Sequence, residues 1–109
     1  MTGEDATDEA LRAIAEPRRR VILRLVAHDE LSAGEIAAAF EVSRTAVSQH
    51  LTVLKHAGLL TERREGTRRL YRADRAALGR LGQVLEQLWS EQLDRLSELA
   101  EAAERERPA

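Results

Sequence analysis

The sequence contains no cysteine, few aromatic residues and no long apolar run, and each of these absences excludes a class of structure. Without cysteine there can be no disulfide, no thiolate nucleophile and no thiolate metal site. The only aromatic residues are Phe40, Tyr71 and Trp89, so a core must be built from Leu, Ile, Val and Ala, which favours packed helices over a β-sandwich. No apolar run approaches the roughly 20 residues of a membrane span, and the acidic start does not resemble a signal peptide. We therefore expect a cytoplasmic protein that makes no membrane contact.

The 109 residues suit a single domain, and their charge is unevenly distributed around a net value of -2. Residues 1–9 carry four acidic residues and no basic one. Residues 10–72 hold 12 Lys and Arg against 7 Asp and Glu, whereas residues 73–109 hold 5 against 8. A basic middle between acidic ends is typical of a DNA-binding module attached to oligomerisation helices, although many charged runs are merely solvated surface.

Apolar periodicity and capping residues predict a mainly α domain of five helices and a small two-stranded β-hairpin over residues 8–104. Residues 1–7 are expected to form a disordered acidic tail, and residues 105–109 to fray. Ser32 with Glu35 matches a capping box, Ser43 and Asp74 are good N-caps, and Gly66 suits the hairpin turn. The predicted helices cover residues 8–15, 17–27, 33–40, 44–57 and 75–104, and the predicted strands cover residues 59–65 and 67–72.

The last predicted helix is too long for a domain of this size. Its roughly 29 residues would measure on the order of 40 Å. Its second half has an apolar stripe with almost nothing in its own chain to cover it, and a symmetric dimer would solve this problem. Trp89 is expected either in the core of that dimer or in the wall of an apolar cavity at the interface. The predicted interface combines the first and last helices and contains Leu11, Ile14, Leu85, Leu88, Trp89, Leu93 and Leu96.

The third and fourth predicted helices are joined by a tight turn at residues 41–43, which is a helix-turn-helix layout. Burial of Val47, Leu51 and Leu54 leaves a polar face on the second of these helices. Arginine can pair with guanine, glutamine with adenine, and serine or threonine with bases or phosphates. An ordinary polar helix face is the alternative. The candidate DNA-binding residues of this recognition helix are Ser43, Arg44, Thr45, Ser48, Gln49, His50, Thr52 and Lys55.

The predicted hairpin carries four arginines around its glycine turn. Basic strands that follow a recognition helix can form a wing, which lies along the DNA backbone or enters the minor groove. A sheet edge protected by charge is the alternative. The candidate wing residues are Arg63, Arg64, Thr67, Arg68 and Arg69.

No metal site, cofactor or catalytic centre is expected. The only histidines are His28, His50 and His56, and the six-residue spacing of the last two does not place them on one helix face. We interpret His50 as a surface or phosphate-contacting residue. The sequence has no glycine-rich phosphate loop, no nucleophile elbow, no metalloprotease helix and no plausible Ser/His/Asp set, so it does not indicate an enzyme.

Residues 11–99 resemble the ArsR family of winged helix-turn-helix transcriptional repressors. The resemblance rests on the stretches at residues 11–20, 42–51, 54–60 and 64–71, taken in order and at this spacing. It implies an obligate homodimer, with the first and last helices at the interface, on an inverted-repeat operator. Many members sense metals through cysteines or through histidine and acidic ligands on the last helix, and this chain lacks both sets. It therefore resembles the branch without a metal site, in which a small molecule, another protein or protein concentration alone is the trigger.

The sequence thus predicts a homodimeric, metal-independent repressor that binds double-stranded DNA, with any small-molecule effector unknown. The alternative is a winged-helix module for protein–protein contact, which usually lacks such an arginine cluster and polar helix face. Salt dependence separates the two, because DNA binding releases counterions and weakens steeply with ionic strength.

Overall fold

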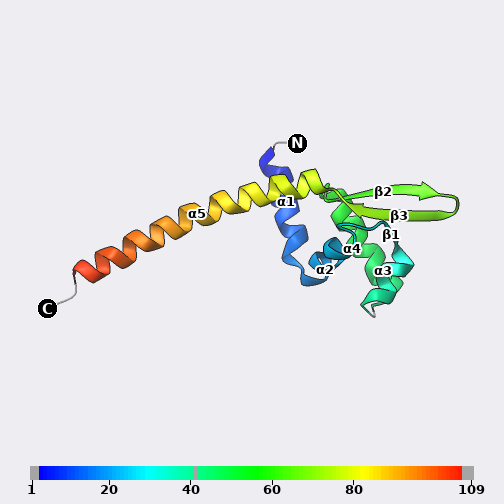
Figure 1. Ribbon diagram of the computed structural model, residues 1–109, viewed down its shortest axis with the longest axis horizontal. Coiled ribbons are helices and arrows are strands. Elements are labelled where there is room, and N and C mark those ends of the chain that lie inside the picture. Colours follow the sequence, from blue (N-terminus) through cyan, green and yellow to red (C-terminus); the bar gives the residue numbers. More distant parts are fainter. Residues whose placement is uncertain (1–2, 41, 107–109) are drawn as a thin grey trace.

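A computed structural model describes residues 3–40 and 42–106, which form five helices and one three-stranded antiparallel sheet (Figure 1). None of the helices in this described part is both long and apolar enough to cross a membrane. The elements in chain order are α1 (Gly3–Ala15), α2 (Pro17–Leu25), β1 (Leu31–Ser32), α3 (Ala33–Ala39), α4 (Arg44–His56), β2 (Leu60–Glu65), β3 (Arg68–Ala73) and α5 (Arg75–Arg105).

The sheet has the strand order β1-β3-β2, so the expectation of a two-stranded sheet is wrong. The hairpin of β2 and β3 turns at Gly66, whose φ of 62° lies in the left-handed region that glycine adopts without strain. The added strand arises because Ser32, as N-cap of α3, has extended backbone angles and pairs with Leu70. Leu31 extends this pairing to Tyr71. A two-residue strand is too short to produce the alternation by which strands are predicted.

The core consists of Leu, Ile, Val and Ala side chains, and none of the described polar or charged residues is buried in it. Val47, Leu51 and Leu54 are buried as predicted, and they pack α4 against the rest of the domain. Ile22 of α2 and Ile36 of α3 are fully buried beside them. Full burial of one such side chain contributes about 1.5–3 kcal/mol, so this cluster fixes the position of α4.

The three predicted N-caps are confirmed. Ser32 Oγ accepts from the backbone N–H of Glu35 at 3.2 Å, and a Glu35 carboxylate oxygen accepts from the Ser32 N–H at 3.0 Å. Ser43 Oγ accepts from the Ala46 N–H at 3.1 Å, and Asp74 Oδ1 accepts from the Ala77 N–H at 3.0 Å. Each cap satisfies backbone donors that a helix start otherwise leaves open.

The N-terminal helix is longer than predicted. It begins at Gly3, so a disordered tail is wrong for residues 3–7, while residues 1–2 lie outside the described part. Asp5 near its start favours the helix, because a carboxylate is stabilised at the positive end of the helix dipole. At the other terminus, α5 continues to Arg105, one residue beyond the predicted end, and residues 107–109 lie outside the described part.

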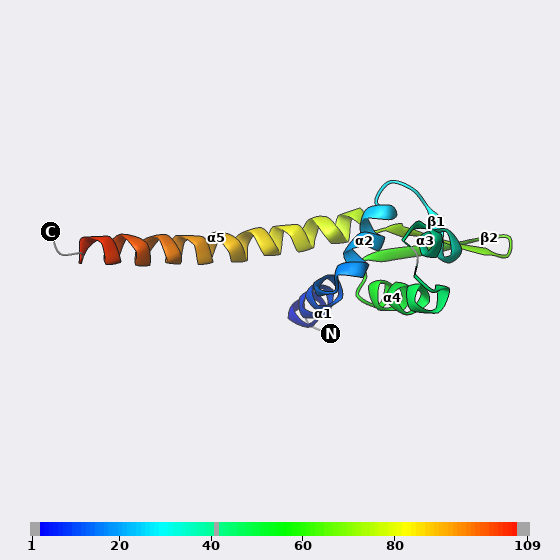
Figure 2. The ribbon, with the colours of Figure 1, turned by 90° about the horizontal axis from the view of Figure 1, so that it is seen from below.

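The most prominent feature of the molecule is α5, which leaves the domain on the side opposite the hairpin (Figure 2). The radius of gyration is 19.1 Å, against about 13 Å for a compact domain of this length. Leu81 is buried against the domain and Leu85 is partly buried, but from Leu88 onward the stripe is uncovered, with Trp89 63% and Leu96 59% exposed. Such a continuous apolar surface is unusual on a soluble monomer and marks an interaction site.

Candidate DNA-binding surface

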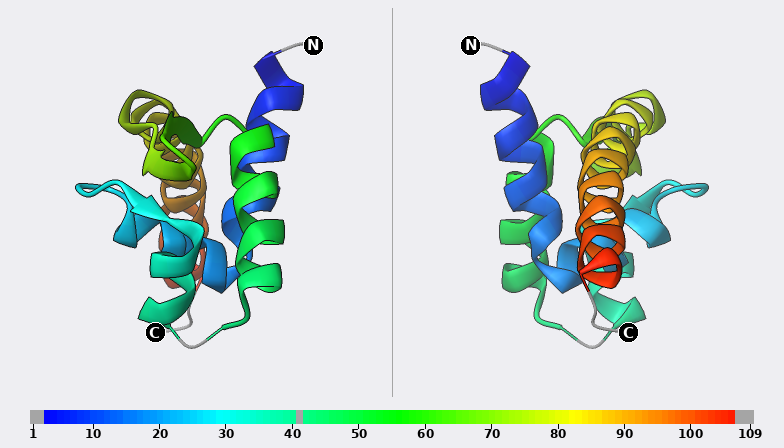
Figure 3. Two further views of the ribbon diagram at one scale, coloured as in Figure 1. Left: turned by 90° about the vertical axis from the view of Figure 1, so that its right-hand side faces the viewer. Right: turned by 90° about the vertical axis from the view of Figure 1, so that its left-hand side faces the viewer.

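The outer face of α4 carries the polar residues that the sequence predicts there. In Figure 3, α4 lies beside α1 and α2 and keeps one long side free. Arg44, Thr45, Ser48 and Gln49 are all exposed within its first two turns. Arg44 forms neither a hydrogen bond nor an ion pair within the described residues. This face is therefore available to a partner outside the chain.

His50 differs from these residues, because it has partners within its own chain. Its Nδ1 accepts a hydrogen bond from Arg19 Nε at 3.2 Å, and its Nε2 lies 3.8 Å from a carboxylate oxygen of Glu16. Only 16% of its side chain is exposed. Arg19 also donates to the carbonyl oxygens of Arg12 and Ala13 at the end of α1. His50 therefore joins α4 to the α1–α2 junction, and its contact with DNA stays a prediction.

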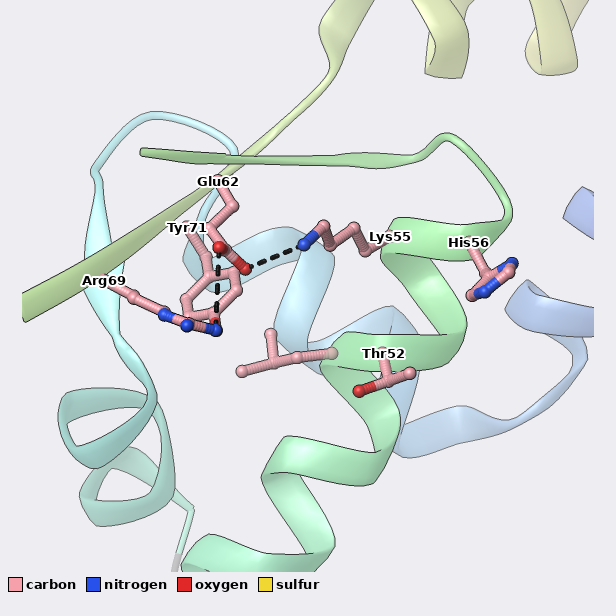
Figure 4. Close-up of a pocket in the computed structure, with 7 residues that line it drawn as sticks. Thr52, Lys55, His56, Glu62, Arg69 and Tyr71 are labelled. Atoms are coloured by element: carbon pink, nitrogen blue, oxygen red, sulfur yellow. Dashed lines mark hydrogen bonds and ion pairs between the residues drawn. The ribbon is translucent and has the colours of Figure 1, made fainter. Parts of the chain in front are cut away.

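The second half of α4 faces the hairpin. Thr52 Oγ1 donates to the Ser48 carbonyl oxygen at 2.9 Å, which is a bond within the helix. Lys55 Nζ donates to a carboxylate oxygen of Glu62 at 3.2 Å, across a groove of about 420 Å³ (Figure 4). Lys55 is thus directed towards β2 in the free protein, while Thr52 stays exposed.

Glu62 is a residue of this surface that the sequence analysis did not single out. Its carboxylate lies between Lys55 and Arg69, with the Arg69 guanidinium at 3.8 Å (Figure 4). The hydrogen bond from Lys55 is the main cause that lowers the pKa of Glu62. Burial raises the pKa of the neighbouring Tyr71. Glu62 therefore connects the end of α4 to β3, and only the folded hairpin brings these groups together.

The wing arginines are exposed, and two of them, Arg63 and Arg68, donate hydrogen bonds to carboxylates. Arg63 donates to Glu30 at 2.6 Å and to Glu65 at 2.9 Å, and these hydrogen bonds, first that to Glu30, raise the pKa of Arg63. Arg68 donates to Glu35 of α3 at 2.6 Å. Such exposed pairs add little stability, but they tie the hairpin to the segment around β1 and α3.

Arg64 differs from these two arginines, because it has no hydrogen-bonding or ion-pair partner within residues 3–40 and 42–106. Thr67, in the hairpin turn, is also exposed. In the wing, the guanidinium of Arg64 is thus free to bind a ligand, whereas carboxylates orient the guanidinium groups of its neighbours.

Residues predicted separately for the recognition helix and for the wing meet in one groove of about 590 Å³. The groove lies between the start of α3, the first turns of α4 and the wing. The spacing of these residues in the sequence could not predict that they share a groove. Their distance depends on how the hairpin strands pair and on where the hairpin lies relative to α4. The predicted site residues that line it are Arg44, Ser48, Thr67, Arg68 and Arg69.

Comparison with known proteins places this surface in a family. A model described as a helix-turn-helix domain matches residues 14–63. The HTH-type transcriptional regulator Rv2034 of Mycobacterium tuberculosis is 42% identical over 102 residues, which cover 94% of this chain and 95% of that protein. The homodimeric winged helix-turn-helix domain of Mb0332 from Mycobacterium bovis, a possible ArsR-family regulator, matches with a TM-score of 0.67. That match is 36% identical and covers 82% of each chain.

The chain belongs to the ArsR family of winged helix-turn-helix transcriptional regulators. Its α3–α4 segment is the helix-turn-helix of that family, and its β2–β3 hairpin is the wing. The HTH-type transcriptional repressor SmtB of Mycobacterium tuberculosis is 41% identical over 68 residues, covering 62% of this chain and 50% of that protein. Among the described residues of this ArsR-family chain, no group of three or more His, Asp or Glu side chains is arranged to hold a metal ion.

Proposed function

We propose that this protein is a sequence-specific transcriptional repressor that binds an inverted-repeat operator as a homodimer. The observation that carries the proposal is the exposed polar face of α4, which a continuous groove joins to the basic wing. In the helix-turn-helix arrangement such a helix enters the major groove and reads base edges from its first turns. Thr45 and Gln49 lie on the part of that face outside the groove, and Gln49 has the donor and acceptor that pair with adenine.

The uncovered stripe of α5 supports the homodimer. Each chain offers one recognition helix, whereas successive major grooves on one face of DNA lie about 34–36 Å apart. Two copies joined through their apolar stripes would present two recognition helices related by two-fold symmetry. The homodimeric state of the Mycobacterium bovis domain supports the same arrangement.

The repressor role and metal independence are further parts of the proposal. The name of the SmtB relative supports repression. Metal independence is proposed because the sequence has no cysteine and its last helix has no histidine. DNA affinity should therefore be the same with and without stoichiometric Zn²⁺, and tight binding of one Zn²⁺ per chain with loss of DNA binding would contradict this part.

Selection of bound duplexes from a random DNA pool tests the proposal. We expect an enriched inverted repeat, bound with an affinity that falls steeply as salt rises. Arg105→Ala, which removes a cation at the far end of α5, is the matched control and should bind as the wild type does. Absence of enrichment, together with weak binding that does not depend on salt, would contradict DNA recognition and favour the protein-interaction module.

A further inference from the structure

Three arginines from two separate elements line the groove between α3, α4 and the wing. Arg44 comes from the first turn of α4, and Arg68 and Arg69 come from the start of β3. The hydroxyl-bearing residues Ser48 and Thr67 line the same groove. Guanidinium groups that share one hollow repel each other, and an anion placed between them removes this repulsion.

The carboxylates near these arginines do not line the groove. Glu35 accepts from one terminal nitrogen of Arg68, and Glu62 lies 3.8 Å from one terminal nitrogen of Arg69. A guanidinium has five N–H donors in a rigid plane, so each of these arginines keeps further donors. Arg44 keeps all of its donors, since no described residue pairs with it. The groove is therefore lined by two guanidinium groups that carboxylates partly pair and by one that has no partner among the described residues, and all three keep donors for a ligand.

We propose that this groove seats one backbone phosphate of each bound DNA half-site, with Arg44 and Arg68 as the groups that hold it. The proposal rests on the proposed function and assigns Arg44 to the DNA backbone, although its position on α4 had predicted a base reader. A phosphate diester matches the arginine fork, and a groove between the recognition helix and the wing is open to a DNA strand that passes between them. Glu35 is then a positioning residue, which orients Arg68 without touching the DNA.

Duplexes with single methylphosphonate linkages test this assignment, because each such linkage removes the charge of one phosphate. They are built on the inverted repeat recovered from the random pool. At one position in each half-site, we expect that replacing the phosphate by a methylphosphonate weakens binding of the wild-type dimer about tenfold. This is the loss in affinity expected for one hydrogen bond to a charged group. In Arg44→Ala and in Arg68→Ala the same linkage should cause a smaller loss than in the wild type, because only one of the two arginines remains to hold the phosphate. In the double variant the loss should be smallest. Arg44→Lys, which keeps the charge but not the fork, should restore part of the sensitivity.

Arg64→Ala is the matched control, since Arg64 is an exposed wing arginine that does not line the groove. It should leave the effect of that linkage unchanged. The assignment is overturned if Arg44→Ala is as sensitive as the wild type at every linkage, or if it loses only the preference for one base pair. Failure of the wild type to bind any duplex would instead contradict the proposed function itself.

A free phosphate could provide the same chemistry, and calorimetry with inorganic phosphate distinguishes this source. We expect no binding at millimolar phosphate, because a single anion lacks the contacts that the rest of the duplex makes. Tight binding of inorganic phosphate that Arg44→Ala abolishes would identify a small phosphorylated ligand and overturn the assignment to DNA.

Discussion

At the scale of single residues, α4 carries two kinds of polar side chain: Thr45 and Gln49 are exposed, whereas His50 is held by Arg19 and lies close to Glu16. The helical period placed Thr45 and Gln49 on the open face of α4, and both are exposed there. The period could not predict the partner of His50, because Arg19 lies 31 positions earlier in the chain. No local pattern reports such a contact, which forms only when α2 packs on α4.

Gln49→Ala should weaken binding to the preferred operator and relax the preference at one base pair. The expected cost is about 1–3 kcal/mol, the discrimination that one two-pronged base contact provides. Competition binding with a set of single-base operator variants measures it. An unchanged order of preference among those variants would show that Gln49 does not read bases.

His50→Ala should destabilise the fold while leaving DNA recognition intact. The substitution removes the acceptor of the Arg19 Nε hydrogen bond, for which a cost of about 0.5–1.5 kcal/mol is typical. Urea unfolding measures the stability, and DNA binding is compared well below the unfolding midpoint. A large loss of DNA affinity in the folded variant would restore His50 to the DNA-binding surface.

At the scale of the elements, sequence reasoning succeeds where a cap or a period marks the element itself. The three N-caps and the buried stripe of α4 are of this kind. It fails for β1, which is too short to have a period, and for the ties between the wing and its neighbours. The ion pairs of Arg63 with Glu30 and of Arg68 with Glu35 span 33 residues each, so they become visible only once the sheet register is known.

The tie between α4 and the hairpin should make stability depend on pH through Glu62. Its pKa is lowered chiefly by the Lys55 hydrogen bond, so the ionised carboxylate stabilises the fold above its ordinary pKa of about 4.3. This stabilisation is lost as the pH falls through the lowered value. Wild type should therefore be more stable than Glu62→Gln at pH 6, and the difference should close at lower pH. Thermal unfolding across this range measures it, and Glu86→Gln, which removes an exposed carboxylate of α5, serves as the control.

The wing as an element should act on DNA through the backbone. Replacing both Arg68 and Arg69 by alanine should weaken binding to the operator and to random DNA about equally. The slope of log affinity against log salt should flatten by roughly 1–2 units for the pair. Binding titrations at several salt concentrations measure both effects. A loss confined to the operator would mean that these arginines read bases.

At the scale of the whole molecule, length was the most informative property of the sequence. A helix of 31 residues cannot be covered by a domain this small, and the structure leaves its second half bare. The exposure of side chains in a single chain does not show which partner covers the apolar stripe of α5. The choice between a dimer core and a cavity wall for Trp89 therefore stays open, although its 63% exposure shows that its own chain does not enclose it.

The dimer is the prediction on which operator recognition depends, and Leu93→Glu tests it directly. Leu93 is 55% exposed in the single chain, so a charge there should hardly affect the folding of one chain. In a symmetric interface the same change would place a carboxylate in the apolar seam twice, and the burial of each leucine is worth about 1.5–3 kcal/mol. We expect sedimentation to show dissociation at micromolar concentration, and operator binding to fall with it although α4 is unchanged.

Gln87→Glu adds the same charge on the opposite side of α5 and should remain dimeric. If Leu93→Glu also remains dimeric and binds the operator, the two copies meet through another surface. Two unpaired carboxylates buried in an apolar interface would destabilise the dimer strongly.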